Sequence, residues 1–268
     1  MSNAIFVKPL PMPSVTASAT DAGYSPQYVG VDQLGVVWKS PAGAATRSIV
    51  IDLGADTAFD TIALFGLTGA QPGWTLQVEA ATAAQGSGFP GGSWVGAAAT
   101  LLAGSTMPKS GRGKALWFAP AVSPPPASRY IRLTFAALAN AAVTVGRVVI
   151  GTRIAFDRNF QFGAAFGWRS LGNADFSSRG VFLRRRGERL RSVGISFPHV
   201  HKDEIETKVN PFVEDVADTE VFCLVTDPDP HAQRQNRMYY GTLVGDLGHV
   251  WARADGFEWR VNMVAQDR

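Results

Sequence analysis

Residues Ile49–Gly54 carry the sequence IVIDLG, a short apolar run with one acidic residue and a final glycine. The segment Thr61–Gly66 repeats this form, whereas Trp74–Ala80 and Tyr130–Phe135 alternate apolar and polar residues. Alternation with a period of two is typical of a strand that buries one face. These segments are separated by glycine- and proline-rich loops and show no convincing helical pattern. They predict an antiparallel β-sandwich in the first half of the chain.

The composition is that of a folded protein of more than one domain. The chain has 268 residues, of which 46% are hydrophobic and 18% are charged. This length exceeds one small sandwich and suits two domains. The single cysteine, Cys223, cannot form an intramolecular disulfide, and its apolar neighbours predict a buried thiol. The first residues lack a signal-peptide pattern, and no stretch has transmembrane length. We therefore expect no membrane insertion and synthesis in a cytoplasm.

Charge is distributed unevenly along the chain. Residues 1–150 contain 9 Lys and Arg and 6 Asp and Glu, whereas residues 151–268 contain 16 of each kind. A shift of this size indicates a domain boundary near Gly151. We accordingly predict one domain over residues 1–151 and a second over residues 152–268.

The second half also has strand patterns, the clearest being Thr219–Thr226 and Phe257–Val264. Between residues 201 and 217 the sequence allows one short helix. Pro211 must lie in the first turn of that helix or break it, because proline has no N–H to donate. The fold class predicted is therefore mainly β: a sandwich followed by a β-barrel or sandwich domain with one short helix.

The order of the segments in residues 15–151 resembles the discoidin, or coagulation-factor type C, galactose-binding-like sandwich, a jelly-roll. The family's apolar-Asp-Leu-Gly strand matches Ile49–Gly54, and its arginine-tyrosine-apolar-arginine strand matches Ala127–Leu133. Further matches come in the family's order: residues 16–19, 37–40, 59–62 and 74–79, then Trp94. The family's flanking cysteine pair is missing. The resemblance covers about half the chain and implies a fold built to present a sugar-binding end.

The second half resembles the domain of phage tail-tube and distal-tail proteins, a barrel with a helix. The join between residues 146–151 and 158–160 also resembles such phage proteins. This resemblance implies a non-enzymatic component of a phage tail tip or baseplate that forms a sixfold ring. It further implies assembly in the host cytoplasm, a final place in the virion, and contacts with tail-tube, hub and tape-measure proteins. The alternative is a stand-alone carbohydrate-binding protein that recognises a bacterial surface glycan.

Aromatic residues supply the candidate sugar site, because flat aromatic faces suit the C–H surfaces of sugars. Tyr24 and Tyr28 lie in a polar loop that corresponds to the ligand-facing end of the resembled family. Trp74 and Trp94 complete the predicted carbohydrate-binding set. A host-surface glycan is the ligand that this set predicts, and a sandwich that acts only as a spacer is the alternative.

Two blocks of opposite charge follow each other in the second half. From Arg153 to Arg191 there are 9 Arg against 3 acidic residues, and from Asp203 to Asp229 there are 9 acidic residues against Lys208 alone. Either these blocks are two solvated faces, or they form a head-to-tail interface between copies of the chain. The predicted interface residues are Arg179, Arg184, Arg185, Arg186, Arg189, Asp203, Glu204, Glu206, Glu214 and Asp215.

No catalytic motif is recognisable, and we expect a protein without enzyme activity, cofactor or bound metal. The glycine-rich residues 86–92 lack the lysine of a phosphate loop. His199 and His201 have a spacing that places both on one face of a strand, with Asp203 and Glu204 as further possible ligands, but the other histidines are distant. A hydrolase is the weakest hypothesis. Nucleic-acid binding through Arg184–Arg186 lacks a supporting motif.

Overall fold

The computed structural model describes residues 2–217, 219–245 and 248–267, which form two compact units. The first unit consists of Ile5–Ile154 together with Cys223–Met238. The second contains the described residues within Ser2–Ala4, Ala155–Phe222 and Tyr239–Arg268. The segment Cys223–Met238 therefore groups with the first half of the sequence. Independent folding of residues 1–151 and 152–268 stays a prediction.

The first unit is built of short strands and two 3-10 helices. The elements that lie wholly or mainly in it are β1 (Ile5–Val7), β2 (Ser14–Ala17), η1 (Pro26–Gly30), β3 (Trp38–Lys39), β4 (Arg47–Thr57), β5 (Thr61–Thr68), β6 (Thr75–Ala81), β7 (Trp94–Val95), β8 (Ala99–Thr100), β9 (Arg112–Phe118), β10 (Ser128–Ala136), β11 (Thr144–Val145), β12 (Arg147–Gly151), β13 (Arg153–Ala155), β18 (Phe222–Val225) and η3 (Arg234–Arg237).

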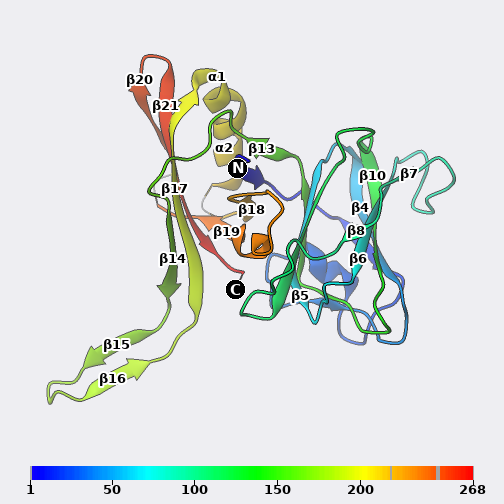
Figure 1. The fold of residues 1–268 in the computed structure, drawn as a ribbon, viewed down its shortest axis with the longest axis horizontal. Helices are drawn as coiled ribbons and strands as arrows, with labels where there is room; N and C mark the ends of the chain where they lie inside the picture. Colours follow the sequence, from blue (N-terminus) through cyan, green and yellow to red (C-terminus); the bar gives the residue numbers. More distant parts are fainter. Residues whose placement is uncertain (1, 218, 246–247, 268) are drawn as a thin grey trace. The chain divides into compact units, whose positions relative to one another are not determined.

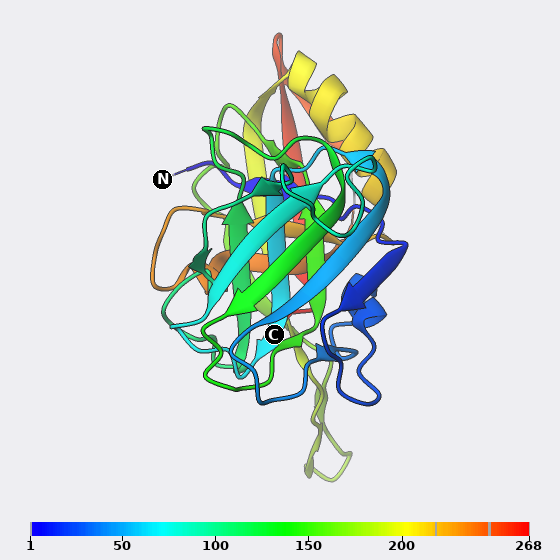
Figure 2. The ribbon, with the colours of Figure 1, turned by 90° about the vertical axis from the view of Figure 1, so that its right-hand side faces the viewer.

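Two antiparallel sheets enclose the core of this unit, which confirms the predicted sandwich. The larger sheet has the order β2-β4-β10-β6-β7, with β8 on β6, and the smaller has the order β12-β5-β9. Figure 2 shows β4, β10 and β6 side by side. Ile51 and Leu133 of the larger sheet and Leu64 and Val148 of the smaller sheet are buried in one cluster. Alternate residues of β4 and β10 point into this cluster, as the period of two predicts.

The opening motif ends at an irregularity within β4 that needs glycine. Gly54 has φ +85°, a backbone conformation that side chains with a Cβ rarely adopt. Its N–H donates to Asp52 Oδ1 at 2.7 Å. The Asp and Gly of the IVIDLG motif thus stabilise the same irregularity in β4.

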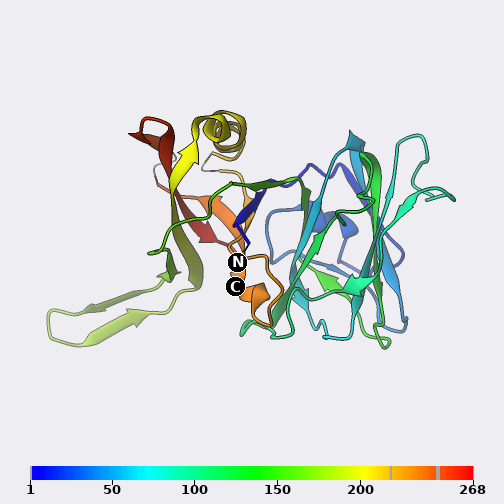
Figure 3. The same ribbon diagram turned by 45° about the horizontal axis from the view of Figure 1, so that its top comes forward.

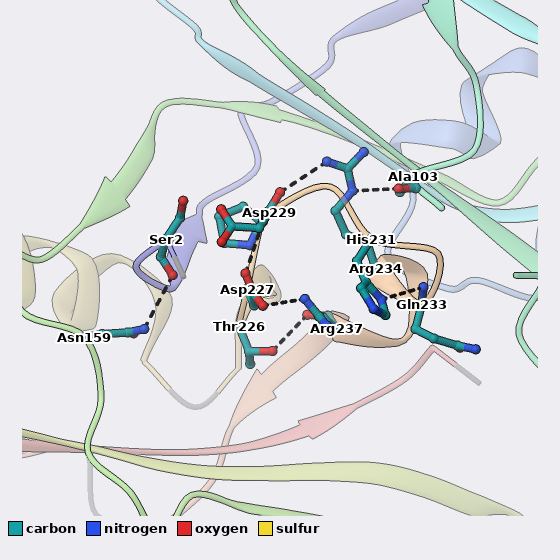
Figure 4. Close-up of polar contacts among 11 residues, drawn as sticks. Ser2, Ala103, Asn159, Thr226, Asp227, Asp229, His231, Gln233, Arg234 and Arg237 are labelled. Atoms are coloured by element: carbon teal, nitrogen blue, oxygen red, sulfur yellow. Dashed lines mark hydrogen bonds and ion pairs between the residues drawn. The ribbon is translucent and has the colours of Figure 1, made fainter. Parts of the chain in front are cut away.

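The segment Cys223–Met238 is bound to the sandwich by polar contacts. Its strand β18 pairs with β1, and its loop places Gln235 against β9 (Figure 4 shows the loop). Lys114 N donates to Gln235 Oε1 at 2.8 Å, and Gln235 Nε2 donates to Gly104 O at 2.6 Å. Arg234 Nε donates to Ala103 O at 2.6 Å, as Figure 4 shows. Gln235 is fully buried, so these contacts supply the partners that its amide requires.

The second unit combines a sheet with one helical run. Its elements are β14 (Ala165–Ser170), β15 (Asn173–Phe176), β16 (Phe182–Arg185), β17 (Arg189–His201), α1 (Lys202–Glu204), the π-helical turn η2 (Ile205–Val209), α2 (Asn210–Val216), β19 (Met238–Leu243), β20 (His249–Arg253) and β21 (Gly256–Ala265). The helical run confirms the predicted short helix. Pro211 lies in the first turn of α2, directly after the π-helical turn, because it has no N–H with which to continue the hydrogen bonding of that turn.

The sheet of the second unit is open. Its strands pair in the order β19-β21-β17-β14, with β20 on β21. Within the described residues no strand pairing closes this sheet on itself, which corrects the barrel form of the prediction. Phe197 and Trp259 stack at 5.7 Å on the buried face, where Phe212 of α2 also packs. In the described part of the chain, no helix has both the length and the apolar character needed to cross a membrane.

Candidate functional site

A tyrosine, an aspartate and a lysine meet at one end of the sandwich. Lys39 Nζ lies 3.1 Å from Asp21 Oδ2 and 5.4 Å from the centroid of the Tyr24 ring. The loop after β2 is held to β3 because Asp21 N donates to Lys39 O at 2.9 Å, and Tyr24 N donates to Asp21 O at 3.1 Å. The Tyr24 side chain is 38% exposed. We call these three residues the Tyr24 cluster.

Other loops meet at the same end of the unit. Residues 40–46 and 137–143 are joined because Gly43 N donates to Asn140 O at 2.8 Å and Leu138 N donates to Ala45 O at 3.1 Å. Ser40 N, next to Lys39, donates to Val143 O at 2.9 Å. We call this part of the sandwich the loop end. Loops that a rigid scaffold holds in place are a common location for binding residues.

The structure separates the four aromatic residues that the sequence suggested for sugar binding. Tyr28 lies in η1 and is half-buried, one turn after Tyr24. Trp74 is only 2% exposed and belongs to the core. A ring enclosed by the core cannot stack on a sugar, which corrects the expectation for Trp74. The alternating sequence pattern that contains Trp74 is as compatible with a ring in the core as with a ring exposed to a ligand.

Trp94 lies at the other end of the sandwich from the Tyr24 cluster. Its strand β7 pairs with β6, with Trp94 opposite Ala80. Its ring packs edge-on against Trp117 at 6.0 Å, and its Nε1 donates to Ser123 O at 3.0 Å. Ser123 lies before the first residue of β10, whereas residues 137–143 of the loop end follow the last residue of β10. Trp94 and Tyr24 therefore do not form one site.

The outer face of the larger sheet is occupied by ion pairs. Arg129 donates from Nε and Nη2 to the two oxygens of Asp52 at 2.8 and 2.9 Å. The hydrogen bond from Arg129 lowers the pKa of Asp52 below its ordinary value. Arg132 pairs in the same two-pronged way with Glu79, and its guanidinium lies 4.4 Å from the centroid of Phe89. These paired charges stabilise the sheet and are not available to a ligand without breaking the pairs.

Most of the predicted interface residues are exposed. Arg184 and Arg185 lie on β16, Arg179 lies in the turn before it, and Arg186 and Arg189 lie at the entry to β17. The acidic members Asp203, Glu206, Glu214 and Asp215 are exposed along the helical run. Among the acidic block, Asp218 lies outside the described residues. Figures 1 and 3 show β15 and β16 at one end of the second unit and the helices at the other.

Glu204 is an exception to this pattern. It is 7% exposed, and its carboxylate accepts hydrogen bonds from Lys208 Nζ at 2.7 Å and from Asp157 N at 3.1 Å. Burial raises the pKa of Glu204, but these hydrogen bonds outweigh burial and lower it below its ordinary value. Glu204 is therefore a structural residue inside the unit, which corrects its assignment to an interface.

A hollow beside the β20–β21 hairpin was not expected from the sequence. It has a volume of about 540 Å³ and is lined by His201, Lys202, Asp203, Trp251, Ala254, Asp255 and Phe257. Trp251 is 69% exposed and stacks on Phe257 at 5.7 Å. We call this cavity the Trp251 hollow. The strand β20 has the apolar run Val250–Ala252 and no alternation of apolar and polar residues, so its sequence contains no signal that this face is open.

The two histidines of the predicted metal spacing lie together. The rings of His199 and His201 are 4.9 Å apart and nearly perpendicular. In the residues that the structure covers, no group of three or more His, Cys, Asp or Glu side chains is arranged to hold a metal ion. Cys223 is fully buried in β18, as its apolar neighbours predicted.

A comparison with protein-family models and with curated proteins gives no match. Among solved structures, a chitosan-binding module of a chitosanase/glucanase from Paenibacillus sp. IK-5 is 16% identical, with a TM-score of 0.40, over 53% of this chain and 97% of that module. A fucose-binding module from Streptococcus pneumoniae is 12% identical, with a TM-score of 0.39, over 54% of this chain and 95% of the module. The CBM32 module of AlyQ, in complex with 4,5-unsaturated mannuronic acid, is 20% identical, with a TM-score of 0.38, over 52% of this chain and 94% of that module.

Proposed function

We propose that the chain is a carbohydrate-binding protein without catalytic activity, and that the loop end of its sandwich holds the sugar. The observation that carries this proposal is the Tyr24 cluster. An exposed phenol ring there lies beside a carboxylate and an ammonium group. The ring offers an apolar surface to sugar C–H groups, and the charged pair offers an acceptor and donors to sugar hydroxyls.

The place of the cluster also supports the proposal. The sequence resemblance to discoidin-like domains implies that the ligand-facing end is the loop that carries Tyr24 and Tyr28. On the outer face of the larger sheet, Arg129 and Arg132 each bind both carboxylate oxygens of a less exposed acidic side chain, whereas Lys39 pairs with one oxygen of Asp21 and both of these side chains are more than a third exposed. The loop end is therefore the part of the sandwich with the better chemistry for a neutral, hydroxyl-rich ligand. A bacterial surface glycan is the ligand class that we propose.

Substitution of Tyr24 tests this function. On an array of bacterial envelope glycans, we expect Tyr24→Ala to weaken binding by about threefold to tenfold, because it removes one stacking contact. Tyr24→Phe keeps the ring and should retain most of the affinity. Tyr130→Ala makes the same change on the outer sheet face and serves as the matched control. A wild-type protein that binds no glycan on such arrays contradicts the proposal.

A second candidate function is a structural component of a phage tail tip, assembled as a ring in the virion with tail-tube, hub and tape-measure proteins. The observation that favours it is the separation of charge in the second unit. Exposed arginines gather on β16 and acidic residues along the helical run, at opposite ends of that unit. Such a separation suits head-to-tail contact between copies. Reversal of Arg184, Arg185 and Arg186 to Glu should then reduce the oligomer mass measured in solution.

A further inference from the structure

One hairpin of the second unit is exposed along its whole length. It comprises residues Ala165–Arg189, which we call the arm, and every residue in it except Gly172 and Ser177 is exposed. Seven of these are large hydrophobic side chains: Phe166 (54%), Trp168 (64%), Leu171 (59%), Phe176 (67%), Val181 (57%), Phe182 (55%) and Leu183 (54%). So many apolar side chains within 25 consecutive residues exceed the isolated apolar residues that an ordinary surface carries.

The strand register shows that part of the arm continues the hydrophobic core. Phe166 on β14 is opposite Val193 on β17, and Trp168 is opposite Arg191. Opposed residues in an antiparallel pair share one face of the sheet, and Val193 is only 2% exposed. Phe166 and Trp168 therefore lie on the core side of the sheet, at the edge of the covered part, where Phe166 stacks on Tyr239 at 6.5 Å and both remain more than half exposed.

The tip of the arm, Phe176–Phe182, is ordered but unsupported. Phe176 and Phe182 are cross-strand partners with ring centroids 5.3 Å apart. The turn between them is closed because Ser177 N donates to Val181 O and Gly180 N donates to Ser177 O, each at 2.9 Å. A lone two-stranded hairpin is marginally stable in water, so an apolar tip of this kind gains most from a surface that covers it.

The Trp251 hollow has the chemistry to receive this tip. The tip and its flanks are apolar and mainly basic, with Arg179 in the turn and Arg184–Arg186 just beyond it, against one acidic residue, Asp175. The hollow offers the aromatic rings of Trp251 and Phe257 and the carboxylates of Asp203 and Asp255, against one lysine, Lys202. Aromatic residues and arginine are enriched at protein interfaces, where apolar anchors fill the centre and charged side chains lie mainly at the rim.

We propose that the arm tip of one copy of this chain docks in the Trp251 hollow of a second copy. Figures 1 and 3 show the arm and the β20–β21 hairpin at opposite ends of the second unit. The contact is therefore heterologous, and each copy keeps one free tip and one free hollow for further copies. The inference is independent of carbohydrate binding, and it names the contact through which the second candidate function would assemble.

The test uses two variants of the full chain, each of which removes one half of the contact. Phe176→Ser with Phe182→Ser alters the tip, and Trp251→Ala alters the hollow. By native mass measurement the wild type should form oligomers of the 28.6 kDa chain, and each variant alone should be monomeric. An equimolar mixture of the two should form dimers, because the intact tip of one variant meets the intact hollow of the other. Val122→Ser, which changes a side chain that is 86% exposed in the first unit, should leave the oligomer unchanged.

Three outcomes overturn the inference: a monomeric wild type, variants that remain oligomeric, or a mixture that stays monomeric. Circular dichroism of each variant establishes that it is folded. The charge-reversed variant, with Glu in place of Arg184, Arg185 and Arg186, distinguishes the two proposals. If it dissociates the oligomer while the tip and hollow variants do not, the second candidate function stands and this contact is wrong. Glycan binding by the monomeric variants should equal that of the wild type.

Discussion

Glu204 is a buried carboxylate whose charge depends on neighbours from its own unit. Lys208 Nζ and the N–H of Asp157 donate to it, and in spite of burial they lower its pKa below its ordinary value. A group with a depressed folded-state pKa stabilises the fold above its ordinary pKa, and this contribution is lost as the pH falls through the folded-state value.

We therefore expect the free energy of unfolding to fall as the pH is lowered below the ordinary pKa of a glutamate, and Glu204→Gln to flatten that dependence. The variant should be less stable than the wild type at pH 7. Urea unfolding at a series of pH values measures both effects. Glu206→Gln, at an exposed position two residues away, is the control and should keep the wild-type profile. An unchanged acid profile for Glu204→Gln contradicts the assignment.

Gln235 is the residue on which the attachment of the segment Cys223–Met238 most depends. Its side chain accepts from Lys114 N and donates to the carbonyls of Gly104 and Thr106. Gln235→Ala leaves these groups without that partner, and we expect a loss of about 2–3 kcal/mol in the free energy of unfolding. Gln233→Ala, in the same loop but exposed, should cost less than about 0.5 kcal/mol. Equal losses for the two variants in urea unfolding would show that burial of the amide is unimportant.

At the scale of single elements, the arm differs from the other strands of the chain. The strands of the sandwich bury alternate residues, whereas β14, β15 and β16 bury none. Hydrogen bonds across an exposed hairpin open easily in water, because few apolar contacts hold the strands together.

Amide hydrogen exchange should show this difference directly. In the monomeric Trp251→Ala variant, we expect residues 165–189 to exchange rapidly, at rates near those of an unfolded chain. In the wild-type oligomer the same residues should exchange more slowly, because a second copy covers them. The strands β4 and β10 provide the internal reference and should be equally protected in both. Slow exchange of the arm in the monomer would show that the hairpin is stable without a second copy packed against it.

At the scale of the whole molecule, the first unit is not continuous in the sequence. It takes in Cys223–Met238, whose Gln235 and Met238 carbonyl contact Lys114 of β9. Lys114 is only 2% exposed, so its ammonium group relies on that carbonyl for a buried hydrogen bond. The sandwich is thus completed by residues from the far half of the chain.

A fragment that ends at Gly151 should therefore be less stable than the sandwich within the full chain. It leaves Lys114 without the Met238 carbonyl, and we expect its melting temperature to fall by on the order of 10 °C. Circular dichroism melts of the fragment and of the full chain compare the two. A fragment that melts like the full chain would instead support independent folding of residues 1–151.

Local patterns in the sequence were sufficient for the class of fold. The apolar run Ile49–Gly54 and the period of two in Tyr130–Phe135 predicted strands of a sandwich. The sequence placed Pro211 in the first turn of a helix or at a break, and it lies in the first turn of α2. These features depend on backbone preferences and on neighbours a few residues away, which a single sequence contains. The burial of Cys223 follows in the same way from the apolar residues on both sides of it.

Only the tertiary structure decided which of these residues are available to a partner. Trp74 and Trp251 both lie in or beside strand patterns, yet the first is 2% exposed and the second 69%. The Tyr24 cluster, the Trp251 hollow and the contact between Lys114 and Gln235, 121 residues apart, join segments that are distant in sequence. Such contacts arise from the packing of sheets and loops against one another, and the alternation within a single strand contains no information about which strand will cover it.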